Sequence, residues 1–330
     1  MKEAMYYEKL EGKKVNCKLC PHYCTIDDGD VGTCRVRKNE GGTLYATTYG
    51  RISSSGYDDI EKKPLYHFYP GSTVYSVGSY GCNLSCDFCQ NHEIVYDDSY
   101  LEDIGMDEVV ENAGKNDSIG IAFTYNEPSI WYEYILDVAK KTHEKGLKNI
   151  LVTNGYINQE PLEELLPYID AMNIDLKSMN DSFYDEVCNG SLEPVLETIE
   201  TASKHVHVEV TNLLIEDKNS DPEEVEELAK KIASIDKKTP LHINRYSPAY
   251  KMDLPATSID ILLKSRDILT EHLDYVYIGN AFGMDSSTDC PNCRAKLIDR
   301  NMDKGEQLVG VEEGICSNCM REVDIIYKKD

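Results

Sequence analysis

The sequence lacks the features that would tie the protein to a membrane or to nucleic acid. No stretch approaches the run of about 18 apolar residues expected of a transmembrane helix. The first residues, MKEAMYYEKLEGKK, contain no apolar segment like that of a secretory signal. Basic residues are few, with 34 Lys and Arg against 59 Asp and Glu and a net charge of −25. Because such a surface repels polyanions and anionic lipid, we expect a cytoplasmic protein with no nucleic-acid or membrane partner.

The chain also lacks internal repeats and low-complexity tracts. Its 330 residues, 41% of them hydrophobic, suffice for one large globular domain with smaller appendages. Cysteine, by contrast, is abundant: the chain has twelve, most of them in groups with CxxC-type spacing. In a compartment that keeps thiols reduced, such groups indicate metal binding, with disulfides as the alternative.

The middle of the chain alternates strand-like with helix-like segments. Helical spacing with a favourable start marks residues 128–146 and the segment that Asp221 caps. The predicted strands lie at 73–80, 119–128, 149–155, 171–177, 205–215, 240–247 and 274–279. Strands joined by helices are typical of parallel βαβ units, so the sequence predicts an α/β fold, either a partial barrel or a doubly wound sheet.

One pattern favours the barrel. The strand at 205–215 alternates valines with His207, Glu209 and Thr211. Parallel strands covered by helices on both sides should be apolar throughout, so a polar inward face implies a lumen with polar contents. Catalytic residues of such folds lie at the carboxyl ends of the strands. The sequence places there Asn126–Glu127, Thr153–Asn154, Asp175–Lys177, Thr211–Asn212 and His242.

The segment CNLSCDFCQ, residues 82–90, directly follows the first predicted strand. Its cysteines, Cys82, Cys86 and Cys89, could bind zinc with His92 as the fourth ligand. They could instead hold an iron–sulfur cluster, which usually takes four cysteines. With three cysteines one iron stays open to a small molecule, and such a cluster would be reactive.

Several motifs resemble those of the radical S-adenosylmethionine (SAM) superfamily. CNLSCDFC matches its CxxxCxxC loop, with Phe88 before the last cysteine. TYNEP, residues 124–128, stands where the branch of pyruvate formate-lyase activating enzymes has a Gly-Gly-Glu-Pro turn, and TNG and DLK follow at the expected strands. The ends, CKLCPHYCTIDDGDVGTCRVR and CPNC…CSNC, resemble the radical enzyme of the AmmeMemoRadiSam group, which co-occurs with AMMECR-like and Memo-like proteins. The resemblance covers nearly the whole chain.

The resemblance implies a fold, a cofactor and a reaction. Residues 66–284 would form a partial (β/α)6 barrel, between four-cysteine modules at 1–65 and 285–330. A [4Fe–4S] cluster on Cys82, Cys86 and Cys89 would bind SAM and reduce it to a 5′-deoxyadenosyl radical. That radical would abstract hydrogen from a protein or peptide, either to activate a glycyl-radical enzyme or for another modification.

The implied partners are a one-electron donor such as ferredoxin or flavodoxin, together with Memo-like and AMMECR-like proteins. Two other functions stay open: an iron–sulfur electron-transfer protein that does not use SAM, and a zinc scaffold that binds proteins. Where the activating enzymes have two glycines, this chain has Tyr125 and Asn126. This departure favours a modification other than glycyl-radical activation.

The strand ends carry side chains of the types that SAM needs. A carboxylate at Glu127 suits the SAM amine, and Lys177 suits the SAM carboxylate. Phe88 offers an apolar face near the adenine. Each polar pair also has a structural interpretation, such as a helix start, a turn or a satisfied core histidine. The predicted cofactor-binding residues are Phe88, Asn126, Glu127, Asn154, Asp175, Lys177, Thr211 and His242.

The flanking cysteines predict two further metal sites. Cys290, Cys293, Cys316 and Cys319 form two CxxC pairs, which predict a zinc ribbon, with rubredoxin-like iron as the alternative. The N-terminal set is Cys17, Cys20, Cys24 and Cys34. Zinc and a second iron–sulfur cluster both fit this set, with His22 as a substitute ligand. Zinc is favoured because a small loop needs a bound ion to stabilise its fold. Cys188, alone on a predicted helix, is interpreted as a buried apolar residue, with a reactive thiol as the alternative.

Overall fold

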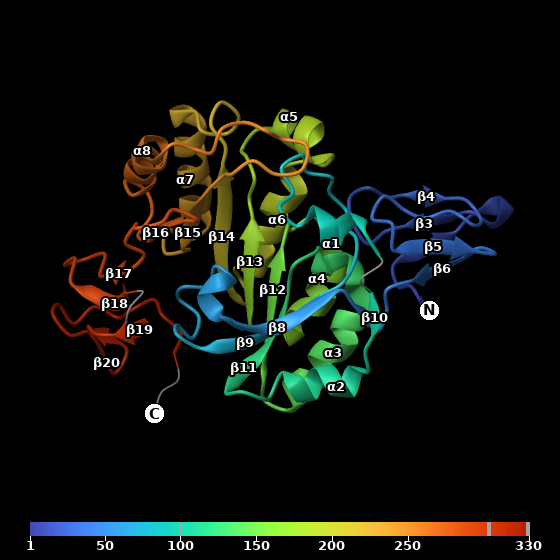
Figure 1. The fold of residues 1–330 in the computed structure, drawn as a ribbon, viewed down its shortest axis with the longest axis horizontal. Helices are drawn as coiled ribbons and strands as arrows, with labels where there is room; N and C mark the ends of the chain where they lie inside the picture. Colours follow the sequence, from blue (N-terminus) through green and yellow to red (C-terminus); the bar gives the residue numbers. More distant parts are fainter. Residues whose placement is uncertain (99–100, 302–304, 328–330) are drawn as a thin grey trace.

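A single eight-stranded sheet forms the centre of the molecule (Figure 1). The computed structural model describes residues 1–98, 101–301 and 305–327. Seven strands are parallel: β9 (Thr73–Gly78), β11 (Ser118–Phe123), β12 (Lys148–Thr153), β13 (Ala171–Asp175), β14 (His207–Leu214), β15 (Leu241–Arg245) and β16 (Val276–Gly279). β8 (Ser54–Asp59) pairs antiparallel with β9 at one edge.

Helices connect successive parallel strands. α1 (His92–Tyr96) and α2 (Met106–Asn112) precede β11, and η3 (Pro128–Trp131) leads into α3 (Tyr132–Glu144) before β12. The later connections contain α4 (Gln159–Leu165), η4 (Leu166–Tyr168), α5 (Asp181–Phe183), the π-helix η5 (Tyr184–Cys188), α6 (Glu193–Ala202), α7 (Pro222–Asp236) and α8 (Ile259–Leu269). Asp221 caps α7 as predicted, since its carboxylate accepts from the amide of Glu223 at 2.9 Å.

The strand order confirms the α/β partial barrel. The parallel strands neighbour one another in the order of the chain, without the reversal that defines a doubly wound sheet. Right-handed crossovers between such strands place all the helices on one face. Six β–α units and a seventh strand therefore enclose an open lumen on the other face. No helix within the described ranges is long and apolar enough to cross a membrane.

The lumen is polar, and part of its content is a loop of the protein itself. Residues 60–72, which join β8 to β9 and begin with η2 (Ile60–Lys62), reach across to the far strands. The amides of Tyr66 and His67 donate to the buried carboxylate of Glu209 at 2.9 and 2.7 Å. Glu209, one of the polar residues that alternate along β14, thus binds this loop at the amino end of the strands.

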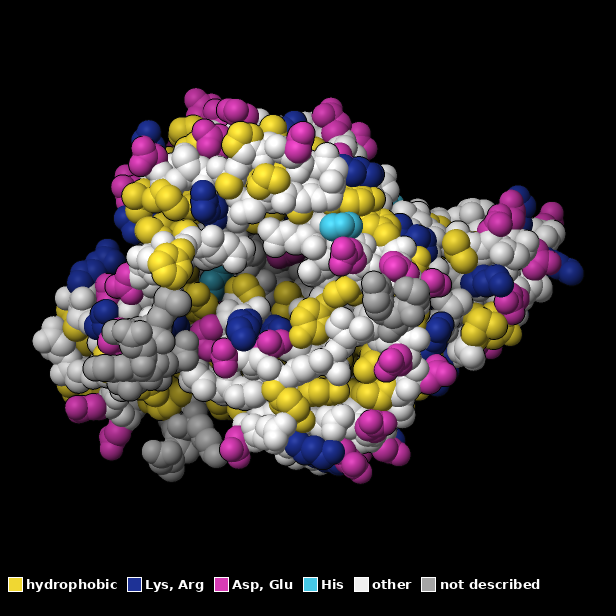
Figure 2. Space-filling view, viewed as in Figure 1, with side chains coloured by type: hydrophobic (Ala, Val, Ile, Leu, Met, Phe, Trp, Pro, Cys, Tyr) yellow, Lys and Arg dark blue, Asp and Glu magenta, His cyan; other side chains and the backbone are white. Residues whose placement is uncertain are grey.

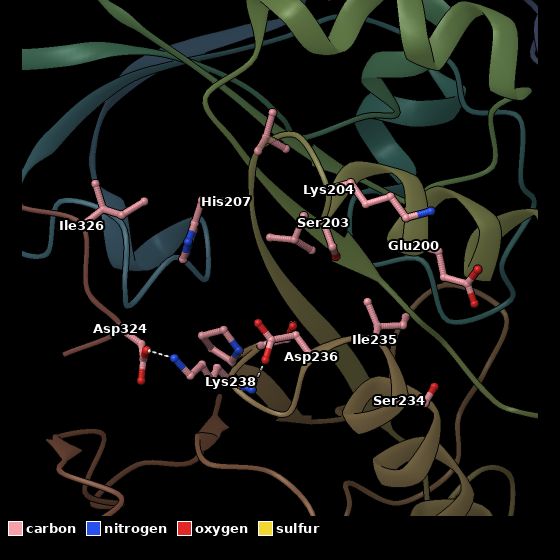
Figure 3. Close-up of a pocket in the computed structure, with 14 residues that line it drawn as sticks. Glu200, Ser203, Lys204, His207, Ser234, Ile235, Asp236, Lys238, Asp324 and Ile326 are labelled. Atoms are coloured by element: carbon pink, nitrogen blue, oxygen red, sulfur yellow. Dashed lines mark hydrogen bonds and ion pairs between the residues drawn. The ribbon is translucent and has the colours of Figure 1, made fainter. Parts of the chain in front are cut away.

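The C-terminal segment docks at the same end of the barrel. It contains β17 (Thr288–Asp289), β18 (Lys296–Asn301), β19 (Gly305–Leu308), β20 (Val311–Glu312) and β21 (Ile315–Cys316). Arg300 donates to the carbonyl of Tyr66 at 2.6 Å, and the amide of Ile326 donates to the carbonyl of His67 at 2.8 Å. A cavity of about 720 Å³ lies beside this junction, where Lys238 pairs with Asp324 at 2.7 Å (Figure 3).

The N-terminal segment lies at the other side of the barrel (Figure 1). β1 (Lys2–Glu3), β6 (Thr43–Ala46) and β5 (Arg37–Glu40) form one small sheet. β2 (Tyr7–Lys9), β3 (Val15–Cys17) and β4 (Thr25–Ile26) form another, with η1 (Glu11–Lys13) between β2 and β3. β7 (Arg51–Ile52) pairs with β10 (Glu102–Asp103). β8, which lies inside the predicted module 1–65, joins the barrel sheet.

Candidate active site at the carboxyl ends of the strands

A cavity of about 260 Å³ lies at the carboxyl ends of the parallel strands. It is lined by all three cysteines of the 82–90 segment and by every predicted cofactor-binding residue except His242. Figure 2 shows the face of the molecule hollowed over the central strands, with acidic side chains scattered on the surrounding surface. Residues at or near the carboxyl ends of all seven parallel strands thus meet around one space, as the barrel fold requires of a catalytic site.

The cysteine loop is held by hydrogen bonds from two sides. The amide of Leu84 and the Nδ2 of Asn154 donate toward the Cys82 sulfur at 3.4 and 3.5 Å, an arrangement that suits a thiolate. The amide of Ser85 donates to the carbonyl of Cys188 at 2.8 Å. Cys188 is buried, and its hydrogen bond with Cys86 together with burial raises the pKa of its thiol. Cys188 is therefore a buried protonated thiol that supports the loop.

The zinc alternative for this loop does not match the arrangement. His92 stacks on Tyr250, with ring centroids 5.0 Å apart, and its Nδ1 lies 3.2 Å from the carbonyl oxygen of Cys89. In the described part of the chain, His92 and the loop cysteines form no group whose ligand atoms lie within 4.8 Å of one another. A cluster of several irons, which holds its ligands farther apart than one ion does, fits the loop better.

Glu127 joins two strand ends and still faces the cavity. Its Oε1 accepts from the amide of Ser129 at 2.9 Å and from the hydroxyl of Thr153 at 2.6 Å, and its Oε2 accepts from the amide of Asn154 at 2.8 Å. A carboxylate offers about four acceptor positions, so one on Oε2 is left for a ligand. Burial raises the pKa of Glu127. The residue thus starts η3, as the structural interpretation held, and can also accept from an amine.

Asp175 and Lys177 form an ion pair at the end of β13. The Lys177 ammonium lies 2.8 Å from Oδ2 of Asp175 and 5.8 Å from the centroid of the Phe88 ring. Burial opposes the charge of Lys177, but Asp175 and the neighbouring thiols outweigh it and raise the pKa of Lys177 well above its ordinary value. The cavity therefore contains a permanent cation beside an apolar ring, which suits a carboxylate and an adenine.

Two of the predicted residues have hydrogen-bond partners within the protein. Asn126 accepts from the amide of Ser79 at 2.8 Å and donates to the carbonyl of Gly81 at 3.1 Å, so its amide holds the chain that leads into Cys82. His242 lies outside the cavity: its Nε2 is 2.6 Å from Oε2 of Glu209. It is the second residue of β15 and sits one layer below the carboxyl end, which makes it a satisfied core histidine.

The sequence prediction missed residues of the last two strands. Asn244, near the end of β15, and Asn280, directly after β16, both line the cavity. A Cβ atom on Gly279 would lie 1.9 Å from Oδ1 of Asn244, so the glycine leaves room for that amide. Both strands were predicted, so the rule that strand ends carry the site would have found both asparagines if it had been applied to the ends of these two strands.

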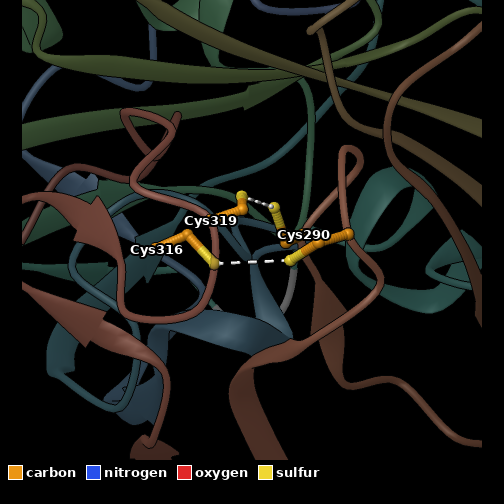
Figure 4. A group of neighbouring side chains, drawn as sticks. Cys290, Cys316 and Cys319 are labelled. Atoms are coloured by element: carbon orange, nitrogen blue, oxygen red, sulfur yellow. Dashed lines mark hydrogen bonds between the residues drawn. The ribbon is translucent and has the colours of Figure 1, made fainter.

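The four C-terminal cysteines are grouped closely enough to bind one metal ion (Figure 4). The sulfurs of Cys290 and Cys319 lie 3.6 Å apart, and those of Cys293 and Cys316 lie 3.7 Å apart. Four sulfurs at about 2.3 Å from a tetrahedral zinc ion stand about 3.8 Å from one another. Hydrogen bonds from Asn292 and the neighbouring backbone lower the pKa of Cys319 to about 6, which favours a thiolate ligand. The structure thus confirms a four-cysteine site whose geometry fits a single ion.

Comparison with known proteins agrees with this site. A family model described as the radical SAM superfamily matches residues 76–232. The uncharacterized protein MJ0808 of Methanocaldococcus jannaschii is 42% identical over 99% of this chain and 100% of its own length. The pyruvate formate-lyase 1-activating enzyme of Escherichia coli K12 is 25% identical over 41% of this chain and 58% of its own length.

A solved structure extends the comparison to the fold. The crystal structure of Streptococcus suis SuiB with its precursor peptide SuiA has a TM-score of 0.51 at 13% identity, over 68% of this chain and 52% of that one.

Three cysteines at a strand end, inside a partial α/β barrel, define a radical SAM enzyme. The chain belongs to the radical SAM superfamily, and within it is distantly related to the glycyl-radical activating enzymes.

Proposed function

We propose that this enzyme abstracts hydrogen from a protein or peptide with a 5′-deoxyadenosyl radical. The observation that carries the proposal is one cavity in which Cys82, Cys86 and Cys89 face Glu127 and Lys177. When bound there, a [4Fe–4S] cluster supplies the electron that cleaves the C5′–S bond of SAM. The three cysteines are the cluster ligands that we propose, and they leave one iron open.

The chain's own residues would hold SAM in place. Glu127 offers its remaining carboxylate acceptor to the SAM amine, and Lys177 offers its ammonium to the SAM carboxylate. Phe88 would cover the adenine, and Thr211, whose hydroxyl donates to Asn173 at 3.0 Å, would lie toward the ribose. These contacts fix the reacting atoms and exclude water from the radical.

Two relatives support a macromolecular substrate. The Escherichia coli relative is a pyruvate formate-lyase activating enzyme, and SuiB was solved with a precursor peptide. Tyr125 and Asn126, in place of two glycines, favour a modification other than glycyl-radical activation. The cysteine-rich ends support membership of the AmmeMemoRadiSam group, so Memo-like and AMMECR-like proteins are the first partners to test. We further propose zinc as the ion of the C-terminal module.

The test of the radical chemistry is 5′-deoxyadenosine, measured by mass spectrometry after anaerobic reconstitution, reduction and addition of SAM. We expect product from the parent, none from Cys86→Ala, and a loss of about tenfold or more from Glu127→Gln. Glu226→Gln, an exposed carboxylate on α7, is the matched control and should retain full activity. A reduced, iron-loaded parent that forms no product would contradict the proposal.

The substrate class needs its own experiment. Hydrogen abstraction from a deuterated substrate carries deuterium into 5′-deoxyadenosine. Extract from cells grown on deuterated amino acids is separated into macromolecules and small molecules, and each fraction is added to the reduced enzyme. We expect deuterium only from the macromolecular fraction, and only while that fraction is not digested by protease. Deuterium from the small-molecule fraction alone, unchanged after that fraction is digested by protease, would refute a protein or peptide substrate.

A further inference from the structure

The N-terminal cysteines surround one buried space. Cys17, Cys20, Cys24 and Cys34 all line one buried space, closed by apolar side chains such as Ile26 and Ile130. All but Cys24 are less than a tenth exposed. Four cysteines gathered around one buried space are placed as the ligands of a bound metal centre would be.

The spacing of these sulfurs differs from that of the C-terminal set. Among the described residues, the C-terminal cysteines form a group with all four sulfurs within 4.8 Å of one another, but no three of the N-terminal sulfurs meet that limit. One tetrahedral ion needs sulfurs about 3.8 Å apart. The same molecule thus contains one set spaced for a single ion and another spaced more widely, as is the cysteine loop of the active site.

A buried cation lines the same space. Arg37 is 1% exposed and pairs with Glu133 at 2.7 Å. Its Nε is buried and has no hydrogen-bond partner among the protein atoms. An unpartnered guanidinium N–H group beside buried cysteines is a donor for an anionic ligand. Thiolates and sulfides of an iron–sulfur cluster provide such acceptors.

The cysteine set also touches the active-site loop. The carbonyl oxygen of Cys34 lies 2.6 Å from the position that a Cβ on Gly81 would take, so these two backbones are in contact. The ring of His22, between Cys20 and Cys24, is 2.7 Å from the carbonyl oxygen of Asn83. Cys34 itself and His22, which lies between Cys20 and Cys24, therefore contact the residues on both sides of Cys82.

From these observations we propose that Cys17, Cys20, Cys24 and Cys34 hold a second iron–sulfur cluster, adjacent to the active-site cluster. This proposal replaces the zinc that sequence reasoning favoured. His22 serves as the contact to the active-site loop and is not a ligand. Arg37 donates its free N–H group to the cluster. The proposal does not depend on SAM cleavage, because it concerns the metal content of the N-terminal cysteines alone.

The decisive variant removes only the active-site ligands. The full chain with Cys82→Ala, Cys86→Ala and Cys89→Ala is reconstituted anaerobically with iron and sulfide, and iron and zinc are counted by mass spectrometry. We expect about two to four iron atoms to remain, with a paramagnetic signal after reduction. Cys290→Ser with Cys293→Ser is the matched control, which should lose the C-terminal ion and no iron. A triple variant without iron, with two zinc ions per chain, would overturn the proposal.

A second measurement remains informative if that variant folds poorly. In the fully reduced parent, two adjacent paramagnetic clusters should broaden each other's electron paramagnetic resonance signals. Cys20→Ser with Cys24→Ser should leave the narrow spectrum of one cluster, with SAM cleavage by the remaining cluster as a separate readout. A spectrum already narrow in the parent, with about four iron atoms per chain, would refute a second cluster and leave the proposed function intact.

Discussion

Glu209 is the residue whose replacement tests the structure most directly. Its buried carboxylate accepts four hydrogen bonds: from the amides of Tyr66 and His67 and from the rings of His207 and His242, at 2.9, 2.7, 3.0 and 2.6 Å. These bonds tie the 60–72 loop to β14 and β15. We predict that Glu209→Gln, which keeps the shape of the side chain, lowers the free energy of unfolding markedly.

The expected loss of stability follows from the hydrogen bonds that the two carboxylate oxygens of Glu209 accept. If the amide nitrogen replaces Oε2, the amide of Tyr66 faces another donor, and an orphaned buried donor costs about 1–3 kcal/mol. The bonds that remain lose the assistance of the negative charge, for a further loss of about 1 kcal/mol. We therefore expect a loss of about 3 kcal/mol at pH 7, a large share of a typical stability of about 5–15 kcal/mol.

Lowering the pH should remove this difference in stability between the parent and Glu209→Gln. Burial opposes the charge of Glu209, but the hydrogen bonds from His207 and His242 outweigh it and hold its pKa well below the ordinary value. The stability that this lowered pKa provides is present above the unfolded-state pKa of about 4.3 and is lost as the pH falls through the folded-state pKa. The gap between parent and Glu209→Gln should therefore be full at pH 7 and narrow below pH ~4.

Urea denaturation of the metal-loaded proteins, followed by fluorescence, measures the difference. Glu226→Gln serves as the control, because its pair with Lys230 is exposed to solvent and contributes little to the free energy of unfolding. The cavity at the carboxyl ends does not contain Glu209, so SAM cleavage per folded molecule should be unchanged. A Glu209→Gln protein as stable as the control would refute the reasoning, since it would mean that the loop does not depend on this carboxylate.

Three further predictions concern other parts of the molecule. Burial lowers the pKa of His67 to about 4, so the unfolded chain binds a proton before the folded one does, and stability should fall from pH ~6.5 to ~4; His67→Gln should flatten that part of a stability–pH curve. Gly279→Ala should displace Asn244 and slow SAM cleavage by on the order of 10- to 100-fold, whereas Gly56→Ala, where a Cβ meets nothing within 4 Å, should not; equal rates would exclude Asn244 from the site. Cys316→Ser should release the C-terminal ion and speed amide exchange in β17 and β18 but not in β12, and unchanged exchange would show that no ion supports the module.

The TYNEP segment shows what a local sequence motif can predict and what it cannot. The sequence places Tyr125 where related enzymes have a glycine, and the structure holds it at φ 71, in the left-handed region that glycine favours. Its hydroxyl donates to Asp58 of β8 at 2.9 Å, a contact with a residue 67 positions earlier. The turn could be predicted from the motif, but the partner that holds a tyrosine in this conformation could not.

The sequence by itself determined the features that depend on neighbouring residues. Cysteine spacing predicted the ligand loop at Cys82 and the pairs at Cys290 and Cys316, because ligands close in sequence are also close in space. Alternating and helical patterns predicted the strands and helices, and with them the strand ends where Glu127 and Lys177 lie. These signals are local, and each can be read from about a dozen consecutive residues.

Only the tertiary structure decided the contacts between distant segments. Glu209 meets the 60–72 loop across more than 140 positions, and Cys34 meets Gly81 across the junction of two modules. His242 faces the lumen as predicted but lies one layer below the candidate active-site cavity, because strand register fixes depth and register is set by pairing with β14. Alternation along a strand tells which face a residue occupies, while packing among strands far apart in the chain decides what that residue touches.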